Sequence, residues 1–261
     1  MKNPVIVSLV LLLSSAVALS KTGNSFRDVQ WKYPRVRTAS QEKNEVLRQK
    51  FAAKQLAYPP KAILLRAFKK EGQLELWATD AEKNPYTLVE TYSICATSGS
   101  LGPKRQFGDM QVPEGFYQLD WFNPQSNFYL SLHISYPNAA DRILGSHQNP
   151  GGDIFLHGNC ASIGCIPITD DGIKEVYWLA VLTKAAGARE LPIEIFPARL
   201  TDKGYRALAM DHRSQPELLG FWNNLKTGFD LFEKTHRPPQ IRVAGDGTYE
   251  FVTQIDSGSG R

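Results

Sequence analysis

The segment HGNCASIGCI, residues 157–166, brings several reactive side chain types together within ten positions. It contains His157, Cys160, Ser162 and Cys165, with glycine at positions 158 and 164. A histidine and two cysteines at this spacing are compatible with three kinds of site. They could bind a metal, form a redox pair, or supply a cysteine nucleophile and its base.

A zinc site is the first alternative, with His157, Cys160 and Cys165 as ligands and His147 as a distant fourth. Structural zinc sites usually pair their ligands at short repeated spacing, and the sequence has no second pair of this kind. We therefore predict no bound metal and no cofactor.

A disulfide is the second alternative, because the chain has three cysteines, Cys95, Cys160 and Cys165. No C-x-x-C motif is present, which argues against a thiol oxidoreductase. Cys160 could stay a buried thiol, pair with Cys95, or pair with Cys165. A bridge to Cys165 would remove its thiolate, whereas a bridge to Cys95 would only brace the segment. We favour a structural Cys160 and a free Cys165.

Nucleophilic catalysis is the third alternative and explains more of the segment. A cysteine nucleophile needs a base, and His157 and Cys165 flank one short loop. We expect their side chains to approach within hydrogen-bond reach, about 3–4 Å, in the unliganded protein. Gly164 lets the backbone approach a substrate closely, and the amides around Gly164 and Cys165 are predicted donors to a developing oxyanion.

The elements that must position these residues are mostly strands. Alternating and β-branched segments predict a hairpin and five further strands. They cover residues 62–79, 86–97, 116–122, 127–137, 151–158 and 191–200. Helical spacing predicts helices over 40–57, about 170–187 and within 202–235, and a terminal hairpin over 239–252. The predicted fold is mainly β with flanking helices.

The N-terminus predicts export. Lys2 precedes an apolar run that ends in small residues, with an A-x-A pattern at Ala16 and Ala18. Residues 1–20 are therefore predicted to be a secretory signal peptide, and an uncleaved anchor is the alternative. Residues 21–59 are predicted to form a linker and a helix, residues 60–198 the central domain, and residues 199–261 a helical extension with the hairpin.

Charge and composition are those of an ordinary globular protein. The 261 residues are 42% hydrophobic and carry a net charge of +4. The sequence has no basic stripe with interleaved aromatic residues, so we predict no nucleic-acid partner.

The segment HGNCASIGCI resembles the active-site motif of the L,D-transpeptidase catalytic domain, the YkuD type. Upstream, KRQFGDMQVPEGFY (104–117) is similar to the stretch that precedes the catalytic region of that family. The resemblance covers about residues 60–198. The compact spacing and the helical C-terminal extension resemble the YafK-type branch. The resemblance implies a β-sandwich catalytic domain.

Carried over position by position, the resemblance makes Cys165 the nucleophile and His157 its general base and acid. Gly158, Ser162 and Gly164 would shape the loop and the oxyanion site. The family usually has arginine two residues after the cysteine, where this chain has Pro167. A positive charge could come instead from Lys104, Arg105 or Arg142. The substrate-binding residues are not predicted.

The implied activity is on peptidoglycan stem peptides in the periplasm. The cysteine would form a thioester at the L-centre of diaminopimelate and then transfer the acyl group to an amine or to water. Hydrolysis could release a wall-linked lipoprotein, as the YafK-type branch is associated with this reaction. A catalytically silent wall-binding protein is the alternative from another class, and Pro167 is its best argument.

Overall fold

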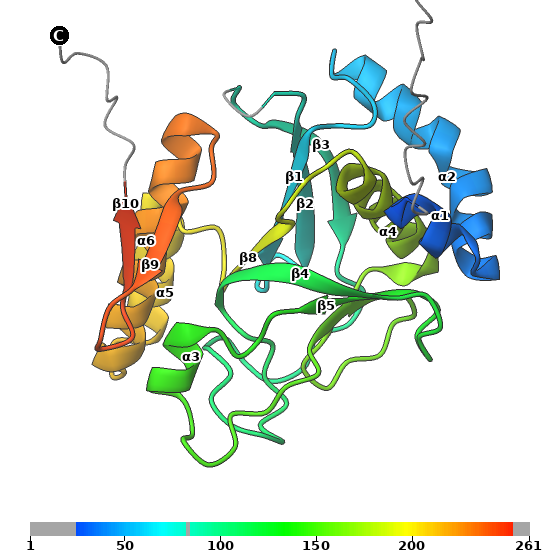
Figure 1. Cartoon of the computed structure of the whole chain (residues 1–261). Helices are drawn as coiled ribbons and strands as arrows, with labels where there is room; N and C mark the ends of the chain where they lie inside the picture. The colour runs from blue at the N-terminus through cyan, green and yellow to red at the C-terminus, as the bar shows by residue number, and fades with distance from the viewer. Residues whose placement is uncertain (1–24, 82–83, 253–261) are drawn as a thin grey trace, which may run out of the picture.

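The computed structural model describes residues 25–81 and 84–252, which form a mixed α/β protein (Figure 1). The helices are α1 (Phe26–Trp31), α2 (Pro34–Ala53), α3 (Ala139–Leu144), α4 (Thr169–Ala185), α5 (Asp202–Asp211) and α6 (Pro216–Thr235). The first five strands are β1 (Ala62–Phe68), β2 (Gln73–Thr79), β3 (Thr87–Ser93), β4 (Gly115–Asn123) and β5 (Ser131–Ile134). The others are β6 (Phe155–His157), β7 (Ile166–Pro167), β8 (Pro192–Phe196), β9 (Gln240–Val243) and β10 (Tyr249–Val252).

Two sequence predictions concern membrane and export segments. The predicted signal peptide, residues 1–20, lies outside the described residues. Within the described ranges, none of the helices combines the length and the apolar character needed to cross a membrane.

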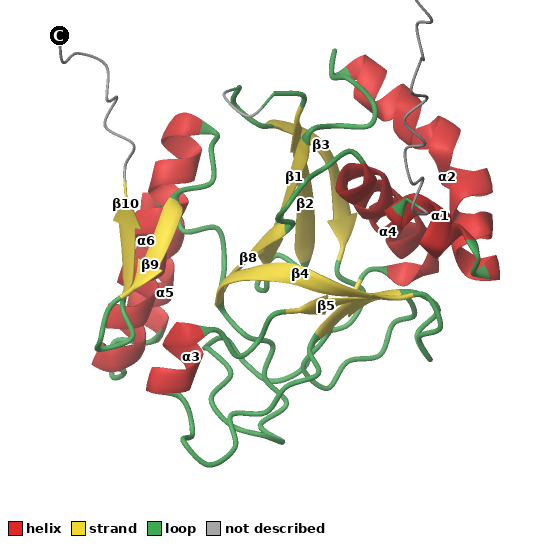
Figure 2. Cartoon of the chain, viewed as in Figure 1, coloured by secondary structure: helices red, strands yellow, loops and turns green. Residues whose placement is uncertain are grey.

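Eight of the strands form one sheet in the order β3-β2-β1-β8-β4-β5-β6-β7. Strand β4 belongs to both halves of this sheet, because its first residues pair with β8 and its last residues pair with β5. The sheet therefore curls, and Figure 2 shows the β1–β3 half turned across β4 and β5. The expected β-rich region with flanking helices is present. The expected two-layer sandwich is corrected to one curled sheet inside a mixed α/β fold, because β4 continues from one half into the other.

Helices α2 and α4 cover one side of the sheet. Ile173, Val176 and Val181 of α4 lie in the same core as Leu47 and Phe51 of α2. Ion pairs also join the helices, among them Lys43 to Asp171 at 2.6 Å and Lys50 to Glu175 at 2.6 Å. This packing holds α4 directly after β7, so the start of α4 is fixed beside the segment 157–166.

The N-terminal region contains more helix than the sequence predicted. Helix α1 begins with a capping box in which Ser25 and Asp28 satisfy each other's backbone N–H groups. Helix α2 begins at Pro34 rather than at Ser40, since proline is well suited to the first helical position. The sequence did not predict either helix start, because residues 25–39 show no clear helical spacing of apolar residues.

The C-terminal helices and the β9–β10 hairpin pack against the sheet near the last residues of the interior strands β1 and β8. Phe68 and Phe196 from these strands share a core with Trp222, Phe229 and Phe232 of α6. The predicted boundary between residues 198 and 199 stays a prediction, although this shared core joins the extension closely to the sheet.

Candidate active site

His157 is the last residue of β6, and Cys165 directly precedes β7. The two strands are parallel, with Leu156 beside Ile166 and His157 beside Pro167. Leu156 and Ile166 point into the core. Side chains alternate between the two faces along extended segments. His157 and Cys165 therefore both lie on the face opposite the core, diagonally across two neighbouring segments.

The imidazole of His157 is held in one orientation. Its Nδ1 donates a hydrogen bond to the carbonyl oxygen of Gly158, and its ring packs 4.5 Å from the ring of Phe128. A carbonyl oxygen can only accept, so Nδ1 carries the proton and Nε2 has the free lone pair. The side chain is 1% exposed. Burial lowers the pKa of His157, opposed by the hydrogen bond to Gly158, so the ring is a neutral base.

Cys165 is the free thiol of the described chain and is half-buried. Its Sγ lies 3.7 Å from the carbonyl oxygen of Asp153. Burial raises the pKa of the Cys165 thiol, while the backbone N–H of Phe155 and the charge of Lys104 act in the opposite direction. The resting site therefore contains a thiol and a neutral imidazole, not a thiolate and an imidazolium.

No hydrogen bond joins Cys165 to His157, because Sγ is turned toward Asp153 and Nδ1 toward Gly158. The expected approach of the two side chains to within about 3–4 Å stays a prediction. The two residues do share one face, and catalytic hydrogen bonds often form only when substrate is bound.

Ser162 organises the loop between the two strands. Its hydroxyl donates to the carbonyl oxygen of Cys165 at 2.8 Å and accepts the N–H of Gly164 at 3.2 Å. A second hydroxyl, that of Ser98, lies 3.1 Å away. The Gly164 amide is therefore engaged in this state, and it would have to leave Ser162 before it could donate to an oxyanion. The predicted oxyanion role stays a prediction.

Glycine is required at both loop positions for packing reasons. Gly164 has a φ of +134°, and a Cβ there would lie 3.1 Å from the carbonyl oxygen of Gln111. A Cβ at Gly158 would meet the Asp170 carboxylate and lie 2.9 Å from the carbonyl oxygen of Phe128. The loop is thus pressed against its neighbours on both sides, which fixes where Cys165 sits.

A disulfide between Cys95 and Cys160 braces the same loop, with a Cα–Cα distance of 5.4 Å. Cys95 also donates its N–H to the carbonyl oxygen of Pro167 at 3.0 Å. Of the alternatives that the sequence left open, the structure has the favoured one, a structural Cys160 and a free Cys165. With Cys160 oxidised, the set His157, Cys160 and Cys165 cannot act as three zinc ligands.

Comparison with known proteins gives the family. No family model matches the chain. Over 189 residues the chain is 36% identical to a protein of Escherichia coli (strain K12) described as "Putative L,D-transpeptidase YafK", with 72% of each chain covered. The same figures apply to the YafK of Escherichia coli O157:H7. The chain belongs to the L,D-transpeptidase family.

Solved structures with lower sequence identity include two bacterial proteins. The helical cell shape determining protein Pgp2 from Campylobacter jejuni aligns with a TM-score of 0.42 and 15% identity, covering 70% of this chain and 73% of that one. L,D-transpeptidase 1 of Mycobacterium tuberculosis aligns with a TM-score of 0.29 and 16% identity, covering 51% of this chain and 61% of that one.

In this L,D-transpeptidase family member, Lys104 is the one of the three candidate cations that is shown to act on the Cys165 thiol. Lys104 is 5% exposed, and its charge lowers the pKa of Cys165. Arg105 is instead paired with Asp141 at 3.4 Å. Arg142 lies in the last turn of α3. Pro167 uses its carbonyl oxygen to hold Cys95 and supplies no charge.

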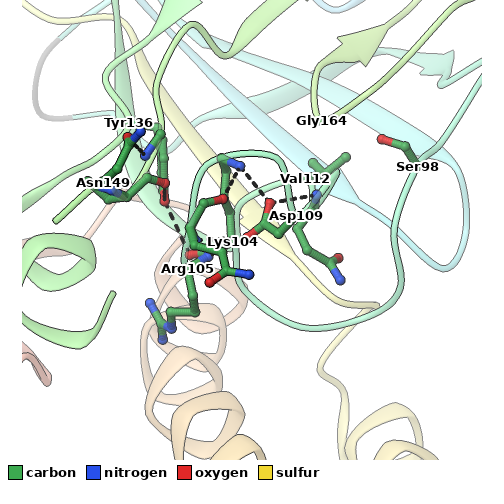
Figure 3. A network of polar contacts seen from close by, with 12 residues as sticks. Ser98, Lys104, Arg105, Asp109, Val112, Tyr136, Asn149 and Gly164 are labelled. Carbon is green, nitrogen blue, oxygen red and sulfur yellow. Dashed lines mark hydrogen bonds and ion pairs between the residues drawn. The ribbon is translucent and has the colours of Figure 1, made fainter. Parts of the chain in front are cut away.

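Asp109 fixes Lys104 in place. The Lys104 Nζ donates to Asp109 at 2.6 Å and to the carbonyl oxygen of Gln106 at 2.9 Å. Figure 3 shows Lys104 and Asp109 pointing toward one another. Asp109 also accepts the N–H groups of Arg105, Gln106 and Gln111. Burial alone would raise the pKa of Asp109, but these hydrogen bonds hold it below the usual range. In the sequence, Asp109 is marked only by its place in the upstream motif KRQFGDMQVPEGFY. Its role in holding Lys104 is evident only from the contacts in the structure.

Proposed function

We propose that this protein is a cysteine acyltransferase of the L,D-transpeptidase type that acts on the stem peptides of peptidoglycan. The observation that carries the proposal is that a neutral histidine with a fixed tautomer and a free thiol lie on the same face of the sheet, beside the parallel strands β6 and β7. Membership of the L,D-transpeptidase family supports the substrate class. The Cys95–Cys160 disulfide supports a periplasmic location, since such bonds persist in oxidising compartments.

The first half-reaction would proceed by general base catalysis. Nε2 of His157 takes the proton of the Cys165 thiol as Sγ attacks the carbonyl carbon at the L-centre of diaminopimelate. The tetrahedral intermediate then collapses, and the C–N bond to the terminal D-alanine breaks. His157 returns its proton to the leaving amine, and a thioester on Cys165 remains.

In the second half-reaction an amine or water attacks the thioester, and His157 removes its proton. An amine acceptor gives a new peptide cross-link, and water gives a shortened stem peptide. Both outcomes use the same two side chains, so the choice depends on which acceptor reaches the site. If the amine expelled in the first half-reaction belongs to a wall-linked lipoprotein instead of D-alanine, attack by water on the thioester completes release of that lipoprotein, which is the alternative reaction. It requires no metal and no cofactor.

Purified muropeptides and mass spectrometry of the products test this proposal. We expect wild type to remove D-alanine from tetrapeptide stems and to transfer the remaining tripeptide unit to an amine or to water. We expect Cys165→Ala to lose this activity by several orders of magnitude while it keeps the wild-type circular dichroism spectrum. Ser100→Ala, in the exposed loop before Lys104, is the control and should leave turnover unchanged. Near wild-type turnover by Cys165→Ala would refute the assignment.

A further inference from the structure

A row of aromatic side chains leads across the sheet from Cys165. Trp121 of β4 pairs with His133 of β5, and His133 pairs with Phe155 of β6. Leu156 is the register partner of Ile166. Phe155 precedes Leu156 and Cys165 precedes Ile166, so Cys165 is the next position in this row. The row therefore crosses four adjacent chain segments and ends at the proposed nucleophile.

The three rings form one continuous surface. Phe155 lies 5.9 Å from Trp121 and 5.2 Å from His133 between ring centroids, and Trp121 lies 6.5 Å from His133. The pairing of β4 with β5 shifts register between Leu119 and Trp121. Such a bulge re-aims side chains, and here it lets both Asp120 and Trp121 meet His133. Asp120 accepts a hydrogen bond from Nδ1 of His133 at 2.6 Å.

This surface is open to solvent although it is built largely from apolar groups. Trp121 is 55% exposed, and the side chain of Asp120 is 48% exposed. A large exposed aromatic side chain within a contiguous apolar surface usually marks a binding site. We define the aromatic platform as Trp121, His133, Phe155 and Asp120.

The chemistry of the platform fits a sugar ring. A pyranose has a face of C–H groups that packs on an aromatic ring, and hydroxyls around its edge that need hydrogen-bond partners. The platform offers indole and phenyl faces together with an indole N–H, the second ring nitrogen of His133 and the second carboxylate oxygen of Asp120. A purely apolar ligand would leave those polar groups unpaired, and a nucleic acid would repel the carboxylate.

The spacing indicates which sugar the platform would bind. Neighbouring strands lie about 4.8 Å apart, so Trp121 and His133 are about 10–14 Å from Cys165 along the row. In a peptidoglycan stem, three residues separate the sugar from the carbonyl that the thiol would attack, and three extended residues span about 10–11 Å. We propose that the aromatic platform binds the sugar residue that carries the stem peptide, so that glycan and reacting carbonyl are engaged together. This rests on the proposed function.

A binding experiment tests the platform without catalysis. The probe is peptide-free glycan strands prepared from peptidoglycan, titrated into the full-length Cys165→Ala protein and followed by calorimetry. We expect Trp121→Ala in this background to weaken binding about tenfold, the effect of losing one aromatic stacking contact, and Trp121→Phe to restore most of it. Trp31→Ala, which removes another partly exposed tryptophan at the end of α1, should leave binding unchanged.

A kinetic comparison adds a second readout. With active protein, Trp121→Ala should raise KM about tenfold for disaccharide-linked tetrapeptide, with little change in kcat, and leave the free tetrapeptide unaffected. Equal effects on both substrates, or no effect of Trp121→Ala on glycan binding, would overturn the inference. If wild type turns over neither substrate yet binds glycan through Trp121, the proposed function fails and the platform stands. If it turns over both substrates without binding glycan, only the platform fails.

Discussion

His157 donates the hydrogen of its Nδ1 to the carbonyl oxygen of the next residue, Gly158. This contact leaves Nε2 as the only ring nitrogen that can accept a proton. Because burial also lowers the pKa of His157 and raises the pKa of Cys165, both side chains are uncharged at neutral pH. In the proposed mechanism, activation of the thiol therefore accompanies the attack on substrate, and the pH dependence of Cys165 reactivity tests this.

The reactivity of Cys165 toward a simple alkylating reagent should rise with pH. Only the thiolate reacts, and a raised pKa keeps the thiolate fraction small at neutral pH. We expect the rate of alkylation by iodoacetamide, measured by intact mass, to increase from pH 6 through the alkaline range, about tenfold per pH unit below the pKa. A rate that is already on a plateau at pH 6 would show a preformed thiolate–imidazolium pair instead.

Replacement of His157 should slow acylation much more than alkylation. His157→Gln removes the base but keeps a side chain of similar size that can pack beneath Phe128. We expect acylation by a carbapenem at neutral pH, followed by mass spectrometry, to fall about 10²–10⁴-fold. Direct alkylation of Cys165 at alkaline pH should change little, because it uses thiolate formed by the solvent. Equal losses in both reactions would indicate a damaged fold, and no loss in acylation would remove His157 from the mechanism.

Lys104 should act on Cys165 through its charge. Lys104→Met removes that charge, so the pKa of Cys165 should rise further and the alkylation profile should move to higher pH. Lys104→Arg is the matched control, because it keeps the charge and can still pair with Asp109. We expect the Lys104→Arg profile to stay close to wild type. Identical profiles for Lys104→Met and wild type would contradict a role for this charge.

The disulfide should contribute stability and not control activity. The bond between Cys95 and Cys160 closes a loop of 65 residues in the unfolded chain. The double variant Cys95→Ser with Cys160→Ser should lose roughly 4 kcal/mol of unfolding free energy, measured by urea denaturation. Both residues are changed because a lone thiol could pair with Cys165. Wild type should be active without reductant; if it is inert until reduced while the double variant is always active, the bond is a redox lock.

The sequence predicted which residues lie close together at the candidate site better than it predicted the contacts that they make. Residues 157–166 are contiguous, so the pattern alone brought His157 and Cys165 to one loop. Contacts between residues far apart in the sequence could not be predicted in this way. Nothing in the spacing chose Cys95 over Cys165 as the partner of Cys160, and Lys104 was one of three possible cations. These choices depend on how segments 94–114 pack against the loop, and a linear pattern does not contain that information.

In the fold too, features that depend on neighbouring residues were predicted, and features that depend on residues far apart in the sequence were not. Alternation predicted most strands, because period-two burial is local. The single curled sheet escaped prediction because it depends on β4 pairing with both β8 and β5. Short helices such as α3 were missed for another reason, since six residues contain too few turns to show periodicity. The bulge beside Asp120, which builds the aromatic platform, has no clear sequence signal.

Arg66 should be essential for holding the C-terminal extension to the sheet. It is fully buried, and its Nε donates to Glu194 of β8 at 2.8 Å while one terminal nitrogen donates to Glu233 of α6 at 2.6 Å. The guanidinium also lies 4.1 Å from the centre of the Phe232 ring. Arg66→Met should cost about 3–5 kcal/mol of unfolding free energy in urea denaturation, because it leaves the Glu194 carboxylate buried without its cation.

Two further variants separate that cause from simple loss of packing. Arg66→Met combined with Glu194→Leu should recover much of the stability, because replacing a whole buried ion pair by apolar groups costs far less than removing one partner. Lys226→Met is the matched control on α6, since its partners Asp202 and Asp230 are solvent-exposed and such pairs contribute about 0–1 kcal/mol. If the double variant is as unstable as Arg66→Met alone, the loss comes from the packing of Arg66 among the phenylalanine rings. If Arg66→Met is as stable as Lys226→Met, the buried cluster does not hold the extension in place.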